Sequence, residues 1–231
     1  MAEPARLDQI GEAAAARVEG GMTVGLGSGS TAEAFIRALG RRVAIGLSIV
    51  GVATSVRSAT LAQRLGIPLR TLDDVSTLDL VIDGADEVDP DLNLIKGLGG
   101  ALLREKIVAL AGRRYLIIVA EEKLVPRLGT RAPIPIEVVP FAWESTASRL
   151  RSLGIETHIR VPSPDTAPFM TDGGHVILDG VIPPGPDIVA LGSAVKATTG
   201  VVEHGLFAGM ADEVLVRGPT GEIRSILRLV D

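Results

Sequence analysis

The sequence predicts an α/β fold, in which helices cover a parallel sheet and a smaller α+β lobe is inserted into that first domain. Three observations support this prediction. Short apolar runs alternate with helical segments up to residue 120, the pattern changes near Pro126, and two further strands follow towards the C-terminal end. Apolar strands that alternate with helices are typical of a parallel sheet that is buried on both faces.

The first domain is predicted to be Rossmann-like. We expect strands at residues 22–25, 47–52, 78–82 and 115–120, and helices over 3–19, near 31–39, over 55–65 and over 101–111. Gly20 and Gly21 end the first helix, and Gly66-Ile67-Pro68 ends the helix over 55–65. Because the expected strands are continuous apolar runs, we expect helices on both faces of the sheet.

The middle of the chain predicts a different arrangement. We expect a strand at 134–139, a helix at 142–153, strands at 155–161 and 175–179, a helix at 187–198 and a strand at 201–204. This βαββαβ order is that of a ferredoxin-like unit. Phe141 and Trp143 are expected in its core.

The C-terminal segment, residues 212–230, predicts two strands around the turn Gly218-Pro-Thr-Gly221. Because a two-stranded hairpin is barely stable alone, we expect it to return to the first sheet. The predicted domains are therefore a Rossmann-like catalytic domain of residues 1–128 plus 206–231, and a ferredoxin-like α+β lobe of residues 129–205. We expect the lobe to serve oligomerisation.

Length and composition limit the possible classes of protein. The chain has 231 residues, of which 46% are hydrophobic, and this is enough for a sizeable core. It contains no cysteine, which excludes disulfides, thiolate nucleophiles and cysteine-ligated zinc. A net charge of −5 and an aromatic content of 3% disfavour nucleic-acid binding.

The sequence also lacks the usual membrane and export signals. No apolar run reaches the roughly 18–20 residues that a membrane span needs. The N-terminal segment lacks the basic and apolar pattern of a secretory signal. We therefore expect a cytoplasmic protein that makes no contact with a membrane.

A glycine-rich turn, Gly25-Leu-Gly-Ser-Gly-Ser-Thr31, lies between the first expected strand and the next helix. Glycines let backbone N–H groups approach an anion, and the N-terminus of a helix favours negative charge. The dinucleotide pattern GxGxxG fails because Ser30 occupies its sixth position, and no GK[ST] follows. The turn therefore indicates either a small phosphate or hydroxyl cradle or an ordinary tight turn.

Four acidic residues lie in the segment Asp83-Gly-Ala-Asp-Glu-Val-Asp89, directly after a buried strand. In open α/β sheets, ligands bind at the carboxyl ends of strands. Spaced aspartates also suit Mg²⁺ or Ca²⁺, although the spacing does not match an EF-hand loop. The residues alone leave three interpretations open: a solvated turn, a divalent-metal site and a ligand site.

The segment Lys96-Gly-Leu-Gly-Gly-Ala-Leu-Leu-Arg-Glu105-Lys106 leads into the next helix. Three glycines in four positions can present N–H groups to an anion. We expect the helix to bury Leu103, Ile107 and Leu110. Glu105 shares a stripe with small and apolar residues, where partial desolvation would raise the pKa of its carboxyl towards neutrality, which suits a general base. For a single helical glutamate, an exposed side chain paired with a neighbouring Arg or Lys is the more frequent arrangement.

Other candidate residues carry weaker signals. Lys123 follows a buried strand, where it is either solvated or able to reach a phosphate. His158, His175 and His204 lie far apart in the predicted lobe, without the spacing of metal ligands. We therefore interpret the three histidines as structural.

Together these segments resemble the type A ribose-5-phosphate isomerase family over essentially the whole chain. The resemblance is carried by GLGSGSTAEAFIRALG, DGADEVDPDLNLIKGLGGALLREK, PIPIEVVPFA and TDGGHVILD, together with the closing strand pair. The second segment is the most specific, because its acids, lysine, glycines and glutamate recur at the family's spacing. Leu98 departs from the family, since many members have Gly or Arg there.

The resemblance implies aldose–ketose isomerisation of D-ribose 5-phosphate and D-ribulose 5-phosphate through a cis-enediolate, a reaction of the non-oxidative pentose phosphate pathway. It implies Glu105 as the proton acceptor, assisted by Asp83, Asp86 and Lys96. The substrate-binding residues that it implies form three segments and one further lysine: Ser28, Gly29, Ser30 and Thr31; Asp83, Gly84, Ala85 and Asp86; Lys96, Gly97, Leu98 and Gly99; and Lys123.

The resemblance implies a small-molecule sugar phosphate as the partner, no cofactor, no metal, and a homodimer or homotetramer. Two alternatives are a sugar-phosphate-sensing regulatory module and a CoA-transferase-like enzyme on a related fold. The first would need a helix-turn-helix, for which we find no spare segment. The second uses a nucleophilic glutamate, so Glu105 alone does not discriminate. Which of Lys96 and Lys123 contacts the phosphate does not follow from the sequence.

Overall fold

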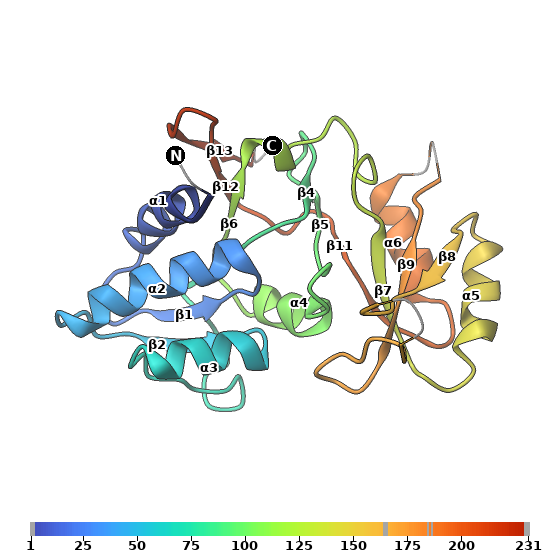
Figure 1. Cartoon of the computed structure of the whole chain (residues 1–231), viewed down its shortest axis with the longest axis horizontal. Coiled ribbons are helices and arrows are strands. Elements are labelled where there is room, and N and C mark those ends of the chain that lie inside the picture. Colours follow the sequence, from blue (N-terminus) through green and yellow to red (C-terminus); the bar gives the residue numbers. More distant parts are fainter. Residues whose placement is uncertain (1–2, 164–165, 184, 186, 229–231) are drawn as a thin grey trace. The chain divides into compact units, whose positions relative to one another are not determined.

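The computed structural model describes residues 3–163, 166–183, 185 and 187–228. They form two compact units (Figure 1). The first unit contains Met1–Ala85, Arg104–Leu124 and Met210–Asp231, and the second contains Asp86–Leu103 and Val125–Gly209. Residues 86–103 therefore group with the second unit, whereas the predicted boundaries place them in the first. Since compactness does not test independent folding, the domain boundaries stay a prediction.

A six-stranded sheet forms the centre of the first unit, in the order β13-β12-β6-β3-β1-β2. All neighbouring strands in it are parallel except β12 and β13, which are antiparallel. The parallel sheet and the return of the C-terminal strands to it confirm the prediction. The strands are β1 (Thr23–Leu26), β2 (Val50–Ala53), β3 (Leu80–Asp83), β6 (Tyr115–Ala120), β12 (Glu213–Arg217) and β13 (Ile223–Leu227).

Helices and strands of this unit share its main core. The helices are α1 (Glu3–Ala15), α2 (Ser30–Ala44), α3 (Val56–Arg64) and α4 (Leu102–Leu110). Only the part of α4 from Arg104 onward belongs to this unit. The helices α1 and α2 lie side by side (Figure 1). Ile10, Phe35 and Leu39 from these two helices are buried against alternate residues of β1, β3 and β6. Alternation arises because successive side chains of a strand point to opposite faces.

Two helices of the first unit end several residues away from their predicted ends. The helix α1 ends at Ala15 rather than at residue 19, and the guanidinium of Arg42 donates to the carbonyl oxygens of Ala15 and Val18 beyond that end. The helix α2 continues through Gly40 to Ala44 rather than ending near residue 39. Gly40 packs against the side chain of Leu65, so this glycine marks a close helix contact and not a helix end.

The second unit contains the ferredoxin-like arrangement that the sequence predicts. Its four-stranded antiparallel sheet has the order β10-β7-β9-β8. Along the chain the elements are β7 (Ile134–Val138), α5 (Trp143–Arg151), β8 (Thr157–Ile159), β9 (Val176–Gly180), α6 (Ile188–Lys196) and β10 (Val201–His204). Apolar side chains from this sheet and both helices form a second core.

A small three-stranded sheet in the second unit was not predicted. Its strands are β4 (Glu87–Val88), β5 (Leu94–Ile95) and β11 (Leu206–Phe207), in the order β11-β5-β4. Both pairs are antiparallel. Two-residue strands are too short to show an apolar alternation, so the sequence indicated only a loop here.

The prediction that Phe141 lies in the second core is wrong. Its side chain is 87% exposed, whereas Trp143 is partly buried and packs against that core. Ala142, between them, has a left-handed backbone conformation with φ 52° at the N-terminus of α5. This turn separates the environments of the two aromatic side chains.

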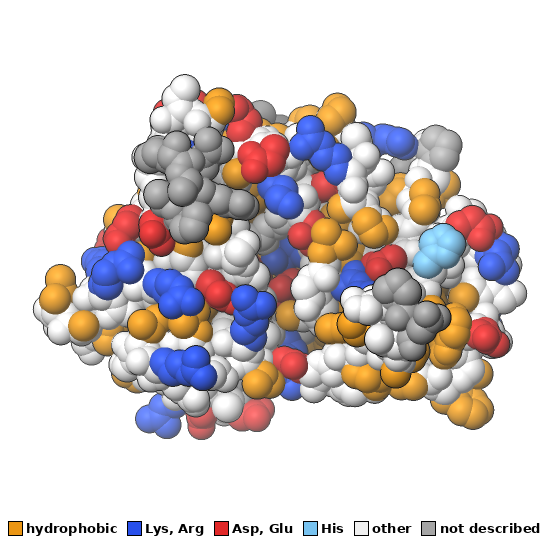
Figure 2. Space-filling view, viewed as in Figure 1, with side chains coloured by type: hydrophobic (Ala, Val, Ile, Leu, Met, Phe, Trp, Pro, Cys, Tyr) orange, Lys and Arg blue, Asp and Glu red, His pale blue; other side chains and the backbone are white. Residues whose placement is uncertain are grey.

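The surface carries mixed charge. Figure 2 shows one face of the protein, on which Lys and Arg side chains are dispersed among Asp, Glu and apolar side chains. Within the part of the chain that the structure describes, no helix has the length and apolar character to cross a bilayer.

The carboxylate of Asp79 joins the starts of β1 and β3. Its Oδ2 accepts hydrogen bonds from the N–H (2.8 Å) and the hydroxyl (2.9 Å) of Thr23. Both bonds lower the pKa of Asp79 below its usual value, and the bond from the backbone N–H has the larger effect. A carboxyl with a lowered pKa stabilises the folded state above its unfolded-state pKa, and that contribution is lost as the pH falls through its folded-state pKa.

We predict that Asp79→Ala lowers the free energy of unfolding at neutral pH by about 1 kcal/mol, because the Thr23 donors lose their acceptor. The difference from the wild type should begin to shrink below about pH 4, where the unfolded-state carboxyl becomes protonated, and should be lost as the pH falls through the lowered folded-state pKa. Urea denaturation over a pH series measures this difference. Asp73→Ala, at an exposed aspartate, is the control and should change little. A difference that persists unchanged in acid would contradict the assignment.

Candidate functional site

The carboxyl ends of β1, β3 and β6 meet at one edge of the first sheet, because these strands are parallel neighbours. The order of strands reverses at β1, since β2 lies on one side of it and β3 on the other. Ligands in open α/β sheets bind at such a reversal. At this edge the structure brings together the glycine-rich turn after β1, Asp83 at the end of β3, and Lys123 in the 3₁₀-helix η1 (Glu121–Lys123) after β6.

The carboxylate of Asp83 is fully buried and holds the glycine-rich turn. Its Oδ1 accepts hydrogen bonds from the N–H groups of Ser28 (3.0 Å) and Gly84 (2.8 Å). Gly27 lies so close to Asp83 that a Cβ at this position would overlap the carboxylate. The glycine is therefore required for the contact, and the contact joins the first two predicted binding segments.

A cluster of hydroxyl groups, which the sequence analysis missed, holds Ser28 from the other side. Ser28 Oγ lies 2.7 Å from Thr54 Oγ1, 2.6 Å from Ser55 Oγ and 3.1 Å from Ser58 Oγ. Ser55 also caps the N-terminus of α3 by accepting a bond from the N–H of Ser58. That N-cap pattern was the available signal, but it indicates a helix start and not a contact with a distant turn.

The rest of the turn presents donors to solvent. Gly29 precedes the first residue of α2, and Gly29 and Ser30 are exposed while Thr31 is half-buried. The first N–H groups of a helix have no partner inside the helix, and together with the helix dipole they favour an anion. The exposed end of α2 therefore has the chemistry of a phosphate cradle.

Glu105 lies in the first turn of α4 and is only 4% exposed. Val108 and Ala109 are buried on the same stripe, and Val108 lies against Gly25 of β1. The predicted apolar stripe for Glu105 is confirmed. The predicted burial of Ile107 and Leu110 is wrong, because these side chains are 47% and 72% exposed. The helix turns its glutamate inward and two of its large apolar side chains outward.

The small sheet of the second unit positions Lys96 at the end of β5. The N–H of Lys96 donates to the carbonyl oxygen of Gly205 at 2.9 Å, next to the pairing of β5 with β11. The Lys96 side chain is 3% exposed, and its Nζ lies 5.6 Å from the centre of the Phe207 ring. An ammonium group over an aromatic face is stabilised by cation–π attraction. The lysine is thus held by both its backbone and its side chain.

The residues after Lys96 form a loop that Asp86 holds in the same unit. The N–H of Asp86 donates to Ile95 at 2.8 Å, and its Oδ2 accepts a bond of 3.0 Å from the N–H of Leu98. The Leu98 side chain is 40% exposed, and Gly99 is also exposed. The structure therefore places the predicted residues Asp86 and Gly97–Gly99 next to one another.

The acidic segment divides between two kinds of role. Glu87 is fully buried and accepts bonds from the N–H groups of Gly129 (2.6 Å), Arg131 and Ala132 (2.7 Å). Asp89 accepts bonds from the N–H groups of Asp91 and Asn93 in a tight turn. These two acids support the backbone, whereas Asp83 and Asp86 hold the predicted binding segments. Among the described residues, no group of three or more His, Cys, Asp or Glu side chains is arranged to hold a metal ion.

His175 and His204 have local hydrogen-bonding partners. His175 Nδ1 lies 2.9 Å from Glu137 Oε1, in a buried cluster to which Thr171 also donates. His204 Nδ1 lies 3.2 Å from the N–H of Leu206, and His158 is exposed on β8. These contacts agree with the structural interpretation of the histidines.

Comparison with known proteins finds relatives in sequence. The family model described as ribose 5-phosphate isomerase A (phosphoriboisomerase A) matches residues 50–221. The ribose-5-phosphate isomerase A of Thermomicrobium roseum is 52% identical over 209 residues, which cover 90% of this chain and 88% of the relative.

Solved structures are similar over nearly the whole chain. The ribose 5-phosphate isomerase A from Methanocaldococcus jannaschii matches with a TM-score of 0.92 at 37% identity, covering 98% of this chain and 100% of that one. A D-ribose-5-phosphate isomerase in complex with phospho-erythronic acid matches with a TM-score of 0.94 at 37% identity, covering 99% and 100%.

We predict that Gly205→Ala destabilises the protein by about 1–3 kcal/mol, because a Cβ at this position would overlap the carbonyl oxygen of Lys96. The amide hydrogen of Lys96 should also exchange faster with solvent. Gly99→Ala is the matched control, since a Cβ there meets nothing within 4 Å, and its effect should stay within about 0.5 kcal/mol. Urea denaturation and hydrogen exchange measure both variants, and equal stabilities would refute the close approach.

Proposed function

Because the chain belongs to the ribose 5-phosphate isomerase A family, we propose that Glu105 is the base of its reaction. The chain is an aldose–ketose isomerase that interconverts D-ribose 5-phosphate and D-ribulose 5-phosphate. The observation that carries the proposal for Glu105 is its burial on the inner stripe of α4, with a side chain that is 4% exposed. A carboxylate shielded from water is a more effective base than a solvated one.

The proposed chemistry moves one proton between two carbons and one proton between two oxygens. In the open-chain aldose, Glu105 removes the proton from C2, and the electron pair of that C–H bond forms the cis-enediolate while the carbonyl oxygen at C1 gains negative charge. The same carboxyl then returns the proton to C1 while the hydroxyl proton of O2 passes to O1, which gives the ketose. A single carboxyl suffices because C1 and C2 are neighbours on the same face of a planar intermediate.

Lys96 and Asp86 are proposed to act on the oxygens of this intermediate. The developing charge needs a cation or oriented N–H groups, and these act most strongly when they are already in place. Support comes from the fixed position of Lys96, which is 3% exposed beside Phe207. Asp83 and Asp86 would accept hydrogen bonds from sugar hydroxyls and assist the proton exchange between O1 and O2. Gly84 and Ala85, between them, would complete the second binding segment.

We propose that the phosphate binds at the turn Ser28–Thr31 and that Lys123 pairs with it. Support comes from the first unit, where the exposed N-terminus of α2 and the half-exposed Lys123 follow neighbouring parallel strands. Lys96 is then the cation that stabilises the oxyanion of the intermediate. The N–H groups of Gly97–Gly99 are further donors to the substrate.

We also propose that the enzyme works in the cytoplasm, in the non-oxidative pentose phosphate pathway, as a homodimer or homotetramer. The family is one of metabolic enzymes, which supports the location and the pathway. The exposed Phe141 supports an assembly through the ferredoxin-like lobe, because a fully exposed aromatic side chain is typical of interfaces. The predicted lobe of residues 129–205 would then be the oligomerisation domain, and residues 1–128 plus 206–231 the catalytic one.

We predict that Glu105→Gln lowers kcat for ribose 5-phosphate isomerisation by at least about 10²–10⁴-fold, because glutamine keeps the shape but cannot accept the proton. Glu144→Gln is the matched control, since Glu144 also lies in the first turn of a helix but is exposed. It should keep the wild-type kcat. Steady-state assays, with circular dichroism to confirm folding, measure both variants.

Three outcomes would count against the proposed chemistry. Wild-type kcat in Glu105→Gln would remove Glu105 as the base. A covalent adduct of Glu105 with a CoA thioester would indicate a transferase instead. Activity that EDTA abolishes and a divalent ion restores would indicate a metal site in the acidic segment, whereas we expect full activity in EDTA.

We predict that Phe141→Ser shifts the protein to a smaller assembly in multi-angle light scattering, because it removes an apolar anchor from the proposed interface. The matched control is Ile45→Ser in the first unit, where the side chain is also 87% exposed. This control should keep the wild-type mass. A monomeric wild type, or equal masses for all three proteins, would refute the proposed interface.

A further inference from the structure

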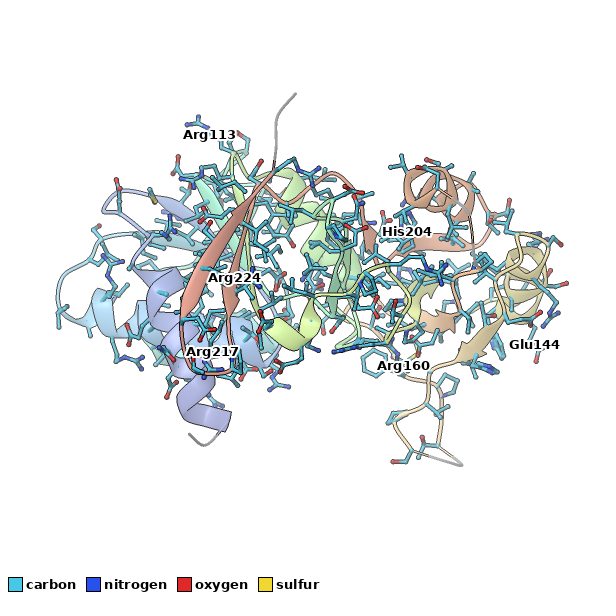
Figure 3. All side chains as sticks on the ribbon, turned by 90° about the horizontal axis from the view of Figure 1, so that it is seen from above. Arg113, Glu144, Arg160, His204, Arg217 and Arg224 are labelled. Carbon is cyan, nitrogen blue, oxygen red and sulfur yellow. The ribbon has the colours of Figure 1, made fainter. Side chains whose placement is uncertain are left out.

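A single arginine donates to two consecutive carbonyl groups of the loop after Lys96. Arg160 follows β8, and its Nη1 lies 3.0 Å from the carbonyl oxygen of Gly97 and 2.8 Å from that of Leu98. The two segments are more than 60 residues apart in sequence but belong to the same compact unit. Figure 3 labels Arg160 in this unit.

The guanidinium of Arg160 is itself held in one orientation. Its Nε donates to Asp179 Oδ2 at 2.9 Å, and its Nη2 donates to Asp179 Oδ1. Asp179 lies on β9, and its side chain is 23% exposed while that of Arg160 is 13% exposed. Such a two-point contact between planar groups fixes both position and plane. The third nitrogen of the guanidinium, Nη1, therefore has a fixed direction towards the loop.

Because the peptide bond is planar, a bond that fixes one carbonyl group also fixes the N–H group of the next residue. In a trans peptide, the C=O of one residue and the N–H of the next point in opposite directions. The carbonyl of Gly97 accepts from Arg160, and the N–H in the same peptide group, that of Leu98, donates to Asp86 Oδ2 at 3.0 Å. Arg160 and Asp86 thus hold opposite sides of one peptide group, and bonds in such a chain strengthen one another.

The next peptide group is held on its carbonyl side. The carbonyl of Leu98 also accepts from Arg160, so the N–H of Gly99 in the same peptide group points away from the guanidinium. Gly99 is exposed. This N–H is one of the donors that the proposed function assigns to the substrate.

We propose that Arg160, oriented by Asp179, is a positioning residue for the isomerisation. It sets the planes of the Gly97–Leu98 and Leu98–Gly99 peptide groups, and through them the Asp86 carboxylate and the Gly99 N–H. This inference rests on the proposed function, because the roles of Asp86 and Gly99 are part of that proposal.

The backbone conformation of the loop explains why Arg160 is needed to orient its peptide groups. Gly97 and Gly100 both have positive φ angles, of 98° and 85°. Glycine populates many backbone conformations, so a glycine-rich loop needs bonds that orient its peptide groups. The N–H of Gly100 supplies one such bond by donating to the carbonyl oxygen of Gly97 at 2.9 Å, and Arg160 holds both that carbonyl and the carbonyl of Leu98. Lysine could not replace Arg160, because a single ammonium group cannot contact both Asp179 oxygens in a fixed plane and both carbonyls.

The test compares three variants of the Arg160–Asp179 pair in steady-state assays with ribose 5-phosphate. These are Arg160→Met, Arg160→Lys and Asp179→Asn. We expect kcat to fall about 10- to 100-fold for Arg160→Met, because small displacements of oriented groups have effects of this size. KM should change less than about threefold, since the proposed phosphate contacts are untouched. Arg160→Lys should resemble Arg160→Met, and Asp179→Asn should lose less kcat.

Two further measurements separate positioning from a purely structural role. Millimolar guanidinium should restore part of the kcat of Arg160→Ala in a saturable manner, whereas methylammonium should not. Asp86→Asn and Arg160→Met should be non-additive in a double-mutant cycle, because one acts through the other. The matched control is Arg151→Met, which removes an exposed Arg151–Glu156 pair in the same unit and should leave kcat unchanged.

Each result decides the proposal. Wild-type kcat and KM in a folded Arg160→Met, or in Asp179→Asn and Arg160→Lys should the methionine variant not fold, would overturn it. Fully additive effects with Asp86→Asn would overturn it as well. A wild type without isomerase activity, or a fully active Glu105→Gln, would instead refute the proposed function, so the two failures can be told apart.

Discussion

The two hydrogen bonds that Asp83 Oδ1 accepts, from Ser28 and Gly84, are the interaction on which the arrangement of the first unit's site depends. They hold the turn after β1 against the end of β3, and this contact is possible only because position 27 has no side chain. A fully buried carboxylate is costly unless its oxygens are hydrogen-bonded. Two backbone N–H groups meet that need at Oδ1, so the strand end and the turn stabilise each other.

The second unit also holds a segment of backbone in one conformation, but there side chains contact the segment from two sides. There the backbone to be held is a glycine-rich loop that follows the two-residue strand β5. Two-residue strands position its start, and side chains hold the rest, with Asp86 on one side and Arg160 on the other. In both units, charged side chains orient peptide groups, and these peptide groups in turn offer N–H donors. Preorganised donors of this kind act at a site without any reorganisation during the reaction.

Sequence reasoning predicted what is periodic or local in this protein. The parallel sheet, the βαββαβ order and the buried stripe of Glu105 all follow from the spacing of apolar residues. The small sheet around Lys96 could not be predicted, because strands such as Glu87–Val88 are too short to show a period. The exposure of Phe141 depends on the left-handed turn at Ala142, which no residue type there indicates.

The site was only partly predictable for the same reason. The predicted binding segments are continuous in sequence, and the resemblance to a family identified them. Ser55, Ser58 and Arg160 contact those segments through tertiary structure alone, from positions far along the chain. A charged residue at the end of a short strand is common on protein surfaces, so Arg160 carried no signal before its partners were known.

Leu98 offers a practical use of the loop's construction. Both its backbone groups are engaged, the N–H by Asp86 and the carbonyl by Arg160, while its side chain is 40% exposed. The side chain can therefore be exchanged without removing the bonds that shape the loop. Since the natural chain contains no cysteine, a cysteine introduced at position 98 would be its sole thiol. A fluorescent label attached there would report on the loop in real time as substrate arrives and product leaves.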